Sequence, residues 1–203
     1  MDLVEKLIKD SWLKTPRIIE AFKKIKRADF VPEGMKDLAE LDEALSIGQG
    51  QTISQPMVVA FMMELLLPEK GEKIIDVGAG SGYSSALLAE IVGKDGKVIA
   101  LEILPEIKRF GEKNVAKYGF IKNKRVEFVL ADGSKGCLKE APFDRILCSA
   151  TVQREIPQTW REQLKVGGKI VAPVGSSVWV FTKKSEKEFD EIEYPGFAFV
   201  PLV

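Results

Sequence analysis

From residue 71 onwards, short apolar runs alternate with longer amphipathic runs, and several of these runs end at a glycine. The short runs predict strands, and the longer ones predict helices. Strands that alternate with helices form a parallel sheet with helices on both faces. We therefore expect an α/β fold with a Rossmann-like, doubly wound and mostly parallel sheet. The predicted strands are 73–80, 97–103, 125–133, 143–151 and 167–175, and the predicted helices are 81–93, 104–119 and 156–164.

The two ends of the chain depart from this alternation. Residues 3–28 have apolar side chains at helical spacing, and Thr15-Pro16 is typical of a helix start, so we expect two short helices there. Residues 178–194 are typical of a hairpin or paired strands with charges on one face. A length of 203 residues fits a single domain.

Composition excludes several classes of function. The sequence has 30 basic and 30 acidic residues, so its charge does not point to nucleic acid as a partner. It has no run of about 18 apolar residues, and we expect neither a membrane segment nor a signal peptide. It contains no histidine, which excludes imidazole bases, histidine-activated nucleophiles and histidine-ligated metals. Cys137 and Cys148 are too few for a metal cluster or a disulfide scaffold, so we expect no metal and a cytoplasmic protein with reduced thiols.

The loop after the first predicted strand, DVGAGSGY, opens a helix and includes Asp76, Gly78, Gly80 and Gly82. Nucleotide-type ligands bind at this place in α/β sheets, and glycine lets the ligand approach the backbone. A dinucleotide-binding loop needs its third glycine at position 83, where this chain has Tyr83. The spacing disfavours a NAD-dependent enzyme and favours S-adenosylmethionine as the cofactor.

Two further strand ends carry acidic residues. Glu102 ends the second predicted strand, where a carboxylate can accept hydrogen bonds from both hydroxyls of a ribose. Asp132 and Gly133 end the third, where an aspartate can reach the amine of an adenine. Because ligands of open α/β sheets bind at the carboxyl ends of the strands, we expect these residues to line the same site as the glycine loop.

Residues 50–56, GQTISQP, combine polar and bendable residues directly before a strongly apolar run. Together with RADFVP, DVGAGSGYSSALLAE, PFDRILCSA, LKVGGKIVAPVG and FVPL, they make the chain resemble the protein-L-isoaspartate O-methyltransferase family over nearly its whole length. GQTISQP is the most specific part, because other methyltransferases lack it. The family usually has proline where Ser46 stands and often glycine where Ala131 stands, which leaves room for a different acceptor preference.

The resemblance implies a class I S-adenosylmethionine-dependent methyltransferase with a small helical N-terminal unit. It also implies the reaction, which is methylation of the free α-carboxylate of L-isoaspartyl residues in damaged proteins or peptides. The ester then closes to a succinimide, and hydrolysis of that ring returns some normal aspartate. In the family, the serine that matches Ser54 contacts the acceptor carboxylate, so Ser54 is the candidate catalytic residue. Thr52 and Ile53, just before it, are candidate cofactor contacts.

On this basis we divide the single domain, residues 1–203, into three parts. Residues 1–50 form the helical unit and substrate loop, residues 51–175 form the cofactor-binding core, and residues 176–203 form C-terminal strands that cover the site. By resemblance, the C-terminal FAFVPLV also holds the acceptor backbone, whereas the sequence alone favours a plain edge strand. We expect a monomer whose substrates are isoaspartyl-containing proteins and peptides.

Simpler interpretations stay open for several of these residues. From its spacing alone, Ser54 before Gln55-Pro56 is an ordinary N-cap, at a helix start whose N–H groups favour an anion. Cys148 and the tryptophans fit packing, and the charge run 183–191 fits a solvated face. The same fold would also serve a methyltransferase for another carboxylate or peptide, or a cofactor-binding module without catalysis.

Overall fold

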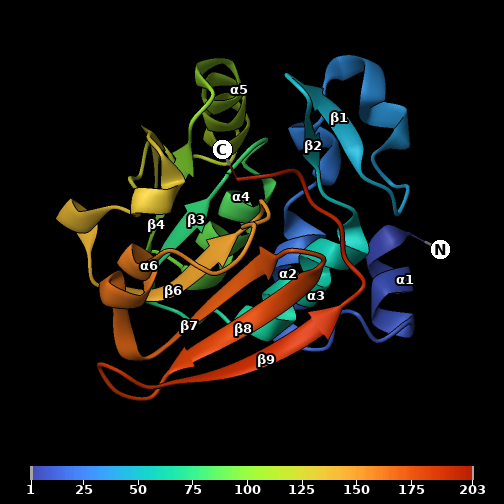
Figure 1. Cartoon of the computed structure of the whole chain (residues 1–203). Helices are drawn as coiled ribbons and strands as arrows, with labels where there is room; N and C mark the ends of the chain where they lie inside the picture. Colours follow the sequence, from blue (N-terminus) through green and yellow to red (C-terminus); the bar gives the residue numbers. More distant parts are fainter. Residues whose placement is uncertain (1, 203) are drawn as a thin grey trace.

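A single sheet of seven strands runs through the centre of the structure (Figure 1). The computed structural model describes residues 2–202. The strands are β3 (Lys73–Val77), β4 (Lys97–Glu102), β5 (Val126–Leu130), β6 (Phe143–Cys148), β7 (Leu164–Val174), β8 (Ser177–Lys183) and β9 (Phe189–Pro195). Their order is β5-β4-β3-β6-β7-β8-β9; the first five strands pair in parallel, and β8 pairs antiparallel with both β7 and β9. The mostly parallel sheet predicted from the sequence is confirmed, and its strand order reverses between β3 and β6.

Helices cover both faces of this sheet, as the alternation predicted. The helices are α1 (Leu3–Lys9), α2 (Pro16–Lys24), α3 (Pro56–Leu66), α4 (Tyr83–Val92), α5 (Pro105–Ala116) and α6 (Gln158–Gln163). Successive side chains of β3 point to opposite faces, so Ile74 and Ile75 join different hydrophobic clusters. The Ile74 cluster includes side chains from α1 to α5, and the Ile75 cluster includes the fully buried Trp160 of α6. No helix within residues 2–202 is long and apolar enough to cross a membrane.

The N-terminal unit packs against the helix that follows the glycine loop. α1 and α2 confirm the helices predicted for residues 3–28. Tyr83, the first residue of α4, has its ring centroid 6.1 Å from that of Phe22 and 5.4 Å from that of Phe30. A large apolar side chain at position 83 therefore joins this unit to the core. Thr15 stands at the N-cap of α2, but its hydroxyl donates to Glu64 of α3 at 2.6 Å instead of capping its own helix.

The segment before α3 folds into a small hairpin of β1 (Leu45–Gly48) and β2 (Gln51–Ile53). Gly48 and Gly50 have φ values of +95° and +70°, which glycine adopts readily, whereas Gln49 between them has a φ of +53° that a residue with a side chain adopts less easily. Ile47 and Ile53 bury their side chains in the same cluster as α3. The polar segment therefore reaches a buried helix because apolar residues within it anchor it. The hairpin also spans residue 50, where we proposed the boundary between the N-terminal unit and the cofactor-binding core.

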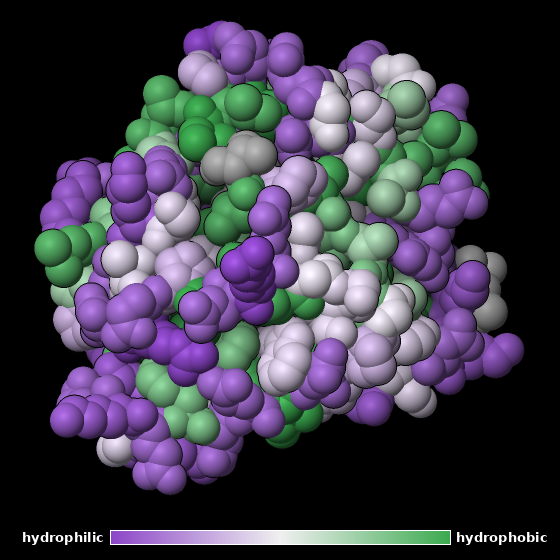
Figure 2. Space-filling model, in the orientation of Figure 1, coloured by the Kyte–Doolittle hydropathy of each residue, from purple (hydrophilic) through white to green (hydrophobic). Residues whose placement is uncertain are grey.

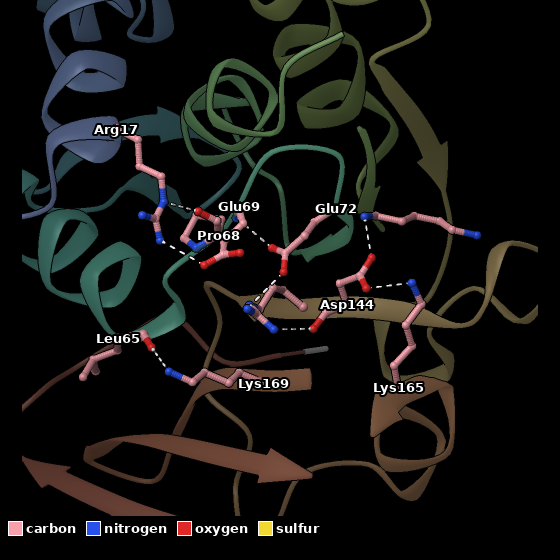
Figure 3. Close-up of polar contacts among 10 residues, drawn as sticks. Arg17, Leu65, Pro68, Glu69, Glu72, Asp144, Lys165 and Lys169 are labelled. Atoms are coloured by element: carbon pink, nitrogen blue, oxygen red, sulfur yellow. Dashed lines mark hydrogen bonds and ion pairs between the residues drawn. The ribbon is translucent and has the colours of Figure 1, made fainter. Parts of the chain in front are cut away.

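Half-buried and exposed charges gather at the amino ends of β3 and β6 (Figure 3). Arg145 Nη2 lies 3.0 Å from Glu72 Oε1, and both side chains are only 14% exposed. Glu72 also accepts a hydrogen bond from the N–H of Glu69 at 2.8 Å. Asp144 pairs with Lys165 at 2.6 Å. These ion pairs lie where the parallel strands begin, on the side of the sheet opposite to their carboxyl ends.

The C-terminal part of the chain confirms one expectation and corrects two. β8 and β9 form the predicted antiparallel pair. Within the charge run, Lys183 is not solvated: it is 2% exposed and donates to the carbonyl groups of Arg161 and Leu164. Residues 196–200 are not an edge strand. They run back across the carboxyl ends of the parallel strands (Figure 1), and Pro201 bridges to Thr151.

Candidate active site

A cavity lies at the carboxyl ends of β3, β4 and β6, beside the point at which the strand order reverses. Most of the residues assigned from the sequence line it, namely Thr52, Ile53, Ser54, Gly78, Gly80, Glu102 and Gly133. Asp76, Gly82 and Asp132 do not. The structure therefore brings the hairpin, the glycine loop and two strand ends to one place, which we name the first cavity.

The three glycines of the loop have different surroundings. Gly78 and Gly80 line the first cavity with φ values of +69° and +54°, which glycine adopts without strain. Gly82 lies behind them. A Cβ atom on Gly82 would be 2.7 Å from Val115 Cγ2 and 2.9 Å from the carbonyl oxygen of Gly111. Gly82 is therefore needed for the close packing of α4 against α5.

Glu102 connects the glycine loop to the end of β4. Its Oε2 accepts a hydrogen bond from the N–H of Gly80 at 3.0 Å. Its Oε1 accepts from the N–H groups of Ile103 and Leu104 at 2.9 and 3.0 Å. A carboxylate has about four lone-pair sites, so these three bonds leave about one site, on Oε2, for a ligand hydroxyl. The side chain is both fixed in place and able to bind.

Asp76 supports α4 from inside the protein. Because side chains alternate along a strand, Asp76 shares the face of Ile74 and lies beneath α4. Its Oδ2 accepts hydrogen bonds from the hydroxyls of Ser84 at 2.7 Å and Ser85 at 2.6 Å, while Oδ1 has no partner among residues 2–202. Burial raises the pKa of Asp76 to about 6, against the effect of the two serine hydroxyls. The structure does not place this carboxylate at the cavity wall.

The carboxylate of Asp132 turns into its own loop. Its Oδ1 accepts from the hydroxyl and the N–H of Ser134 at 2.6 and 3.0 Å, and its Oδ2 lies 3.2 Å from Lys135 Nζ. The Ser134 hydroxyl is the main cause that lowers the pKa of Asp132. Gly133 lines the cavity, and its carbonyl oxygen accepts from Trp160 Nε1 at 2.9 Å. The wall is thus formed by the loop backbone rather than by the aspartate side chain.

A second cavity adjoins the first on the side of the C-terminal segment. Its lining residues are Ala44, Thr52, Ser54, Gln55, Val58, Ser149, Ala198, Phe199 and Val200. Four of these residues also line the first cavity, namely Thr52, Ser54, Ser149 and Val200. The N-cap interpretation of Ser54 is wrong, because Gln55 occupies that position. The Ser54 hydroxyl makes no hydrogen bond to another residue within 2–202, so it is free to bind a ligand.

Charged residues from the N-terminal unit hold the segment that carries Ser54. Arg27 is 3% exposed and has no carboxylate partner within residues 2–202. Its Nη2 donates to the carbonyl groups of Glu43 at 2.7 Å and Ser54 at 3.2 Å. Burial lowers the pKa of Arg27. Asp42 Oδ1 accepts from the N–H of Met57 at 2.9 Å, so this protein carboxylate occupies part of the helix start that the sequence offered to an anion.

Sequence reasoning missed several residues of the two cavities. Ile103 and Leu104 line the first cavity, and their position directly after Glu102 could have indicated this. Ser149 directly follows β6 and lines both cavities, and its place at a strand end, like that of Glu102, is the signal that could have indicated it. Arg27 occurs in a quoted motif, RADFVP, but no local pattern shows that a guanidinium will reach a carbonyl 27 residues away.

Comparisons with known proteins identify the family of this chain. The family model of protein-L-isoaspartate(D-aspartate) O-methyltransferase matches residues 1–203. The protein-L-isoaspartate O-methyltransferase of Methanopyrus kandleri is 44% identical, over 99% of this chain and 89% of that protein. The enzyme of the same name from Aeropyrum pernix is 40% identical, over 99% of this chain and 78% of that protein.

Solved structures share the fold over almost the whole chain. A crystal structure from Plasmodium falciparum, in complex with S-adenosyl-L-homocysteine, has a TM-score of 0.89 at 22% identity and covers 99% of this chain and 96% of that one. A protein-L-isoaspartate O-methyltransferase has a TM-score of 0.88 at 28% identity and covers 98% of this chain and 64% of that one. The chain therefore belongs to the protein-L-isoaspartate(D-aspartate) O-methyltransferase family, whose members methylate isoaspartyl residues of damaged proteins with S-adenosylmethionine.

Proposed function

We propose that the first cavity binds S-adenosylmethionine and that the second receives the isoaspartyl residue. The observation that carries this proposal is the shared wall, in which Thr52, Ser54, Ser149 and Val200 line both cavities. A methyl group transferred at this wall passes directly from the first cavity to the second. When bound, S-adenosylmethionine supplies an activated methyl group on a sulfonium.

The residues of the first cavity fit this cofactor. Gly78 and Gly80 allow the ligand to lie against the backbone, and Glu102 keeps about one lone-pair site for a ribose hydroxyl. Ile103 and Leu104 offer apolar contacts beside Glu102 for a base. Thr52, Ile53 and Ser54 bring the hairpin to the same wall, next to the second cavity. We assign supporting roles to Asp76, Gly82 and Asp132. The residues assigned as cofactor contacts are Thr52, Ile53, Gly78, Gly80, Glu102, Ile103, Leu104 and Gly133.

The chain needs no general base for this transfer. A carboxylate has a reference pKa of about 4 and is ionised at neutral pH, so no proton has to be removed before it attacks. The remaining task is to hold one carboxylate oxygen in line with the methyl group at about 3 Å. The free hydroxyl of Ser54 can donate to that carboxylate, and Arg27 fixes the Ser54 backbone through its carbonyl group. This division of roles is consistent with a site without histidine.

The C-terminal segment provides a place for the acceptor backbone. Ala198, Phe199 and Val200 line the second cavity and lie outside any strand of the sheet. The N–H of Thr151 donates to the carbonyl group of Val200 at 2.8 Å, which ties the segment to the end of β6. An extended peptide can therefore lie along residues 198–200 with its isoaspartyl carboxylate directed towards Ser54.

The test is a matched pair of peptides that differ only in an isoaspartyl or aspartyl linkage. The wild-type protein should methylate the isoaspartyl peptide and leave its counterpart unmodified. Ser54→Ala should lose about 1.5–3 kcal/mol of transition-state binding, which is about 10- to 150-fold in kcat/KM, and should bind S-adenosylhomocysteine with unchanged affinity. Ser185→Ala, on the exposed turn before β9, is the control and should keep full activity. Full activity of Ser54→Ala would remove Ser54 from the proposed role.

One alternative methyl acceptor is a carboxylate that does not belong to an isoaspartyl residue. A panel of small carboxylic acids and tailored peptides, assayed with labelled cofactor, distinguishes the two.

We also propose that the protein is a monomer, since Figure 2 shows apolar residues on this face as separate groups among hydrophilic ones rather than as one large patch. A cytoplasmic location is supported by two buried cysteines that are both free thiols.

A further inference from the structure

The second cavity has an unusual lining for a site that receives an anion. Its lining residues include no lysine and no arginine. The nearest helix start is already partly occupied, because the N–H of Met57 donates to Asp42. A carboxylate placed here must therefore be held by uncharged donors of the lining. The polar side chains available for this are those of Thr52, Ser54, Gln55 and Ser149.

Ser149 is the one such residue that the sheet itself supplies. It follows the last residue of β6 and lines both cavities. Its N–H donates to the carbonyl group of Val77 at 3.0 Å, which fixes its backbone beside the end of β3. Its hydroxyl makes no hydrogen bond to any other residue within 2–202. A half-buried hydroxyl in this position, held on a rigid strand end, lacks a partner until a ligand provides one.

Ser54 and Ser149 reach the shared wall from different elements, one from the segment before α3 and one from the sheet. A carboxylate has two oxygens, and one hydroxyl alone leaves the second oxygen free to turn away from the methyl group. Two donors on different elements fix the plane of the carboxylate as well as its position. Orientation of this kind lowers the barrier of a reaction between two bound groups.

We propose that Ser149 is a second acceptor-binding residue, whose hydroxyl donates to the isoaspartyl α-carboxylate together with Ser54. This inference rests on the proposed function of the second cavity. It assigns a substrate contact to a residue that the sequence alone did not single out. It also predicts that the affinity for the carboxylate charge, and not for the peptide as a whole, depends on Ser149.

The experiment measures peptide binding to the full chain loaded with S-adenosylhomocysteine, using two peptides. One carries the isoaspartyl α-carboxylate, and the other carries an α-carboxamide at the same position. The ratio of their dissociation constants reports the recognition of the charge. Ser149→Ala should weaken binding of the carboxylate peptide by about tenfold, or about 1.4 kcal/mol, and should leave the carboxamide peptide nearly unchanged. With the carboxylate peptide as substrate, KM should rise more than kcat falls.

Two further variants separate a contact from a structural effect. Ser149→Thr keeps a hydroxyl at this position and should retain most of the preference for the carboxylate. Ser185→Ala, on the exposed turn before β9, should leave both dissociation constants unchanged. A Ser149→Ala protein with the wild-type ratio of the two constants would overturn the inference while leaving the proposed function intact. A wild-type protein that does not distinguish the two peptides would instead contradict the proposed function itself.

Discussion

Gly82 and Gly78 belong to the same loop, yet the structure predicts that alanine at Gly82 mainly lowers stability, whereas alanine at Gly78 mainly lowers cofactor affinity. At Gly82, φ is +84°, and a left-handed conformation costs an alanine about 1–2 kcal/mol. The new Cβ would also lie 2.7 Å from Val115 Cγ2 and 2.9 Å from a backbone oxygen of Gly111. Forcing α4 and α5 apart adds about 1–3 kcal/mol. The expected loss of unfolding free energy for Gly82→Ala is therefore about 2–5 kcal/mol.

At Gly78 the same substitution meets ordinary contacts. The atom nearest to a new Cβ is the Cβ of Ala150, at 3.6 Å, so only the conformational cost of about 1–2 kcal/mol applies. Both Gly78 and Ala150 line the first cavity, and the new methyl group takes space from the cofactor. Gly78→Ala should weaken S-adenosylhomocysteine binding by about tenfold or more, which is about 1.4 kcal/mol.

Thermal unfolding and calorimetric titration with S-adenosylhomocysteine measure the two effects separately. For a chain of this size, each kcal/mol lowers the unfolding temperature by about 2–4 °C. Gly82→Ala should thus unfold roughly 4–20 °C below the wild type, and Gly78→Ala roughly 2–8 °C below it. The affinity should fall more in Gly78→Ala. If Gly82→Ala proved the more stable variant and the weaker binder, the packing role assigned to Gly82 would be wrong.

Two further predictions concern buried charges. Because burial raises the pKa of Asp76 from 3.8 to about 6, ionising it costs the folded state stability as the pH rises from about 4 to 7. The unfolding free energy of Asp76→Asn should therefore rise relative to that of the wild type by roughly 3 kcal/mol over this range, as measured by urea unfolding at each pH. A difference between the two proteins that stays constant with pH would contradict the assignment. Arg145→Met leaves Glu72 without its 3.0 Å partner and should lose about 1.5–3 kcal/mol in urea unfolding. The Lys165 side chain is 43% exposed, so Lys165→Met should lose less than about 1 kcal/mol of unfolding free energy. An equal loss in Arg145→Met and Lys165→Met would refute this reasoning.

Most of the fold follows from patterns that are local in the sequence. Apolar runs of strand length, glycines at their ends and amphipathic helices between them fix the parallel sheet. The glycine loop and Glu102 could be placed because strand ends of such a sheet meet at one edge. That reasoning did not place Asp76, because β3 is buried on both faces and the sequence does not show that α4 covers the face shared by Ile74 and Asp76.

Other features depend on contacts between distant parts of the chain. At the helix start after Ser54, the N–H of Met57 donates to the carboxylate of Asp42, which lies 15 residues before Met57 in the sequence. Gly82 is required by α5, whose approach no pattern within the glycine loop reveals. The C-terminal segment lies over the two cavities because Thr151 and Val200 are joined there. In each case the residue's role is set by a partner that sequence spacing does not identify.

The outer edge of the sheet has a consequence for a protein that handles damaged chains. Damaged proteins expose extended segments, and an open strand is where such segments add by backbone hydrogen bonds. β9 is the last strand of the sheet, and it carries Asp190, Glu191 and Glu193 with exposed side chains and ends at Pro195. Acidic side chains and a proline discourage pairing at such an edge. We therefore expect extended segments of damaged proteins to pair poorly with β9, so that they are not held at this edge of the sheet.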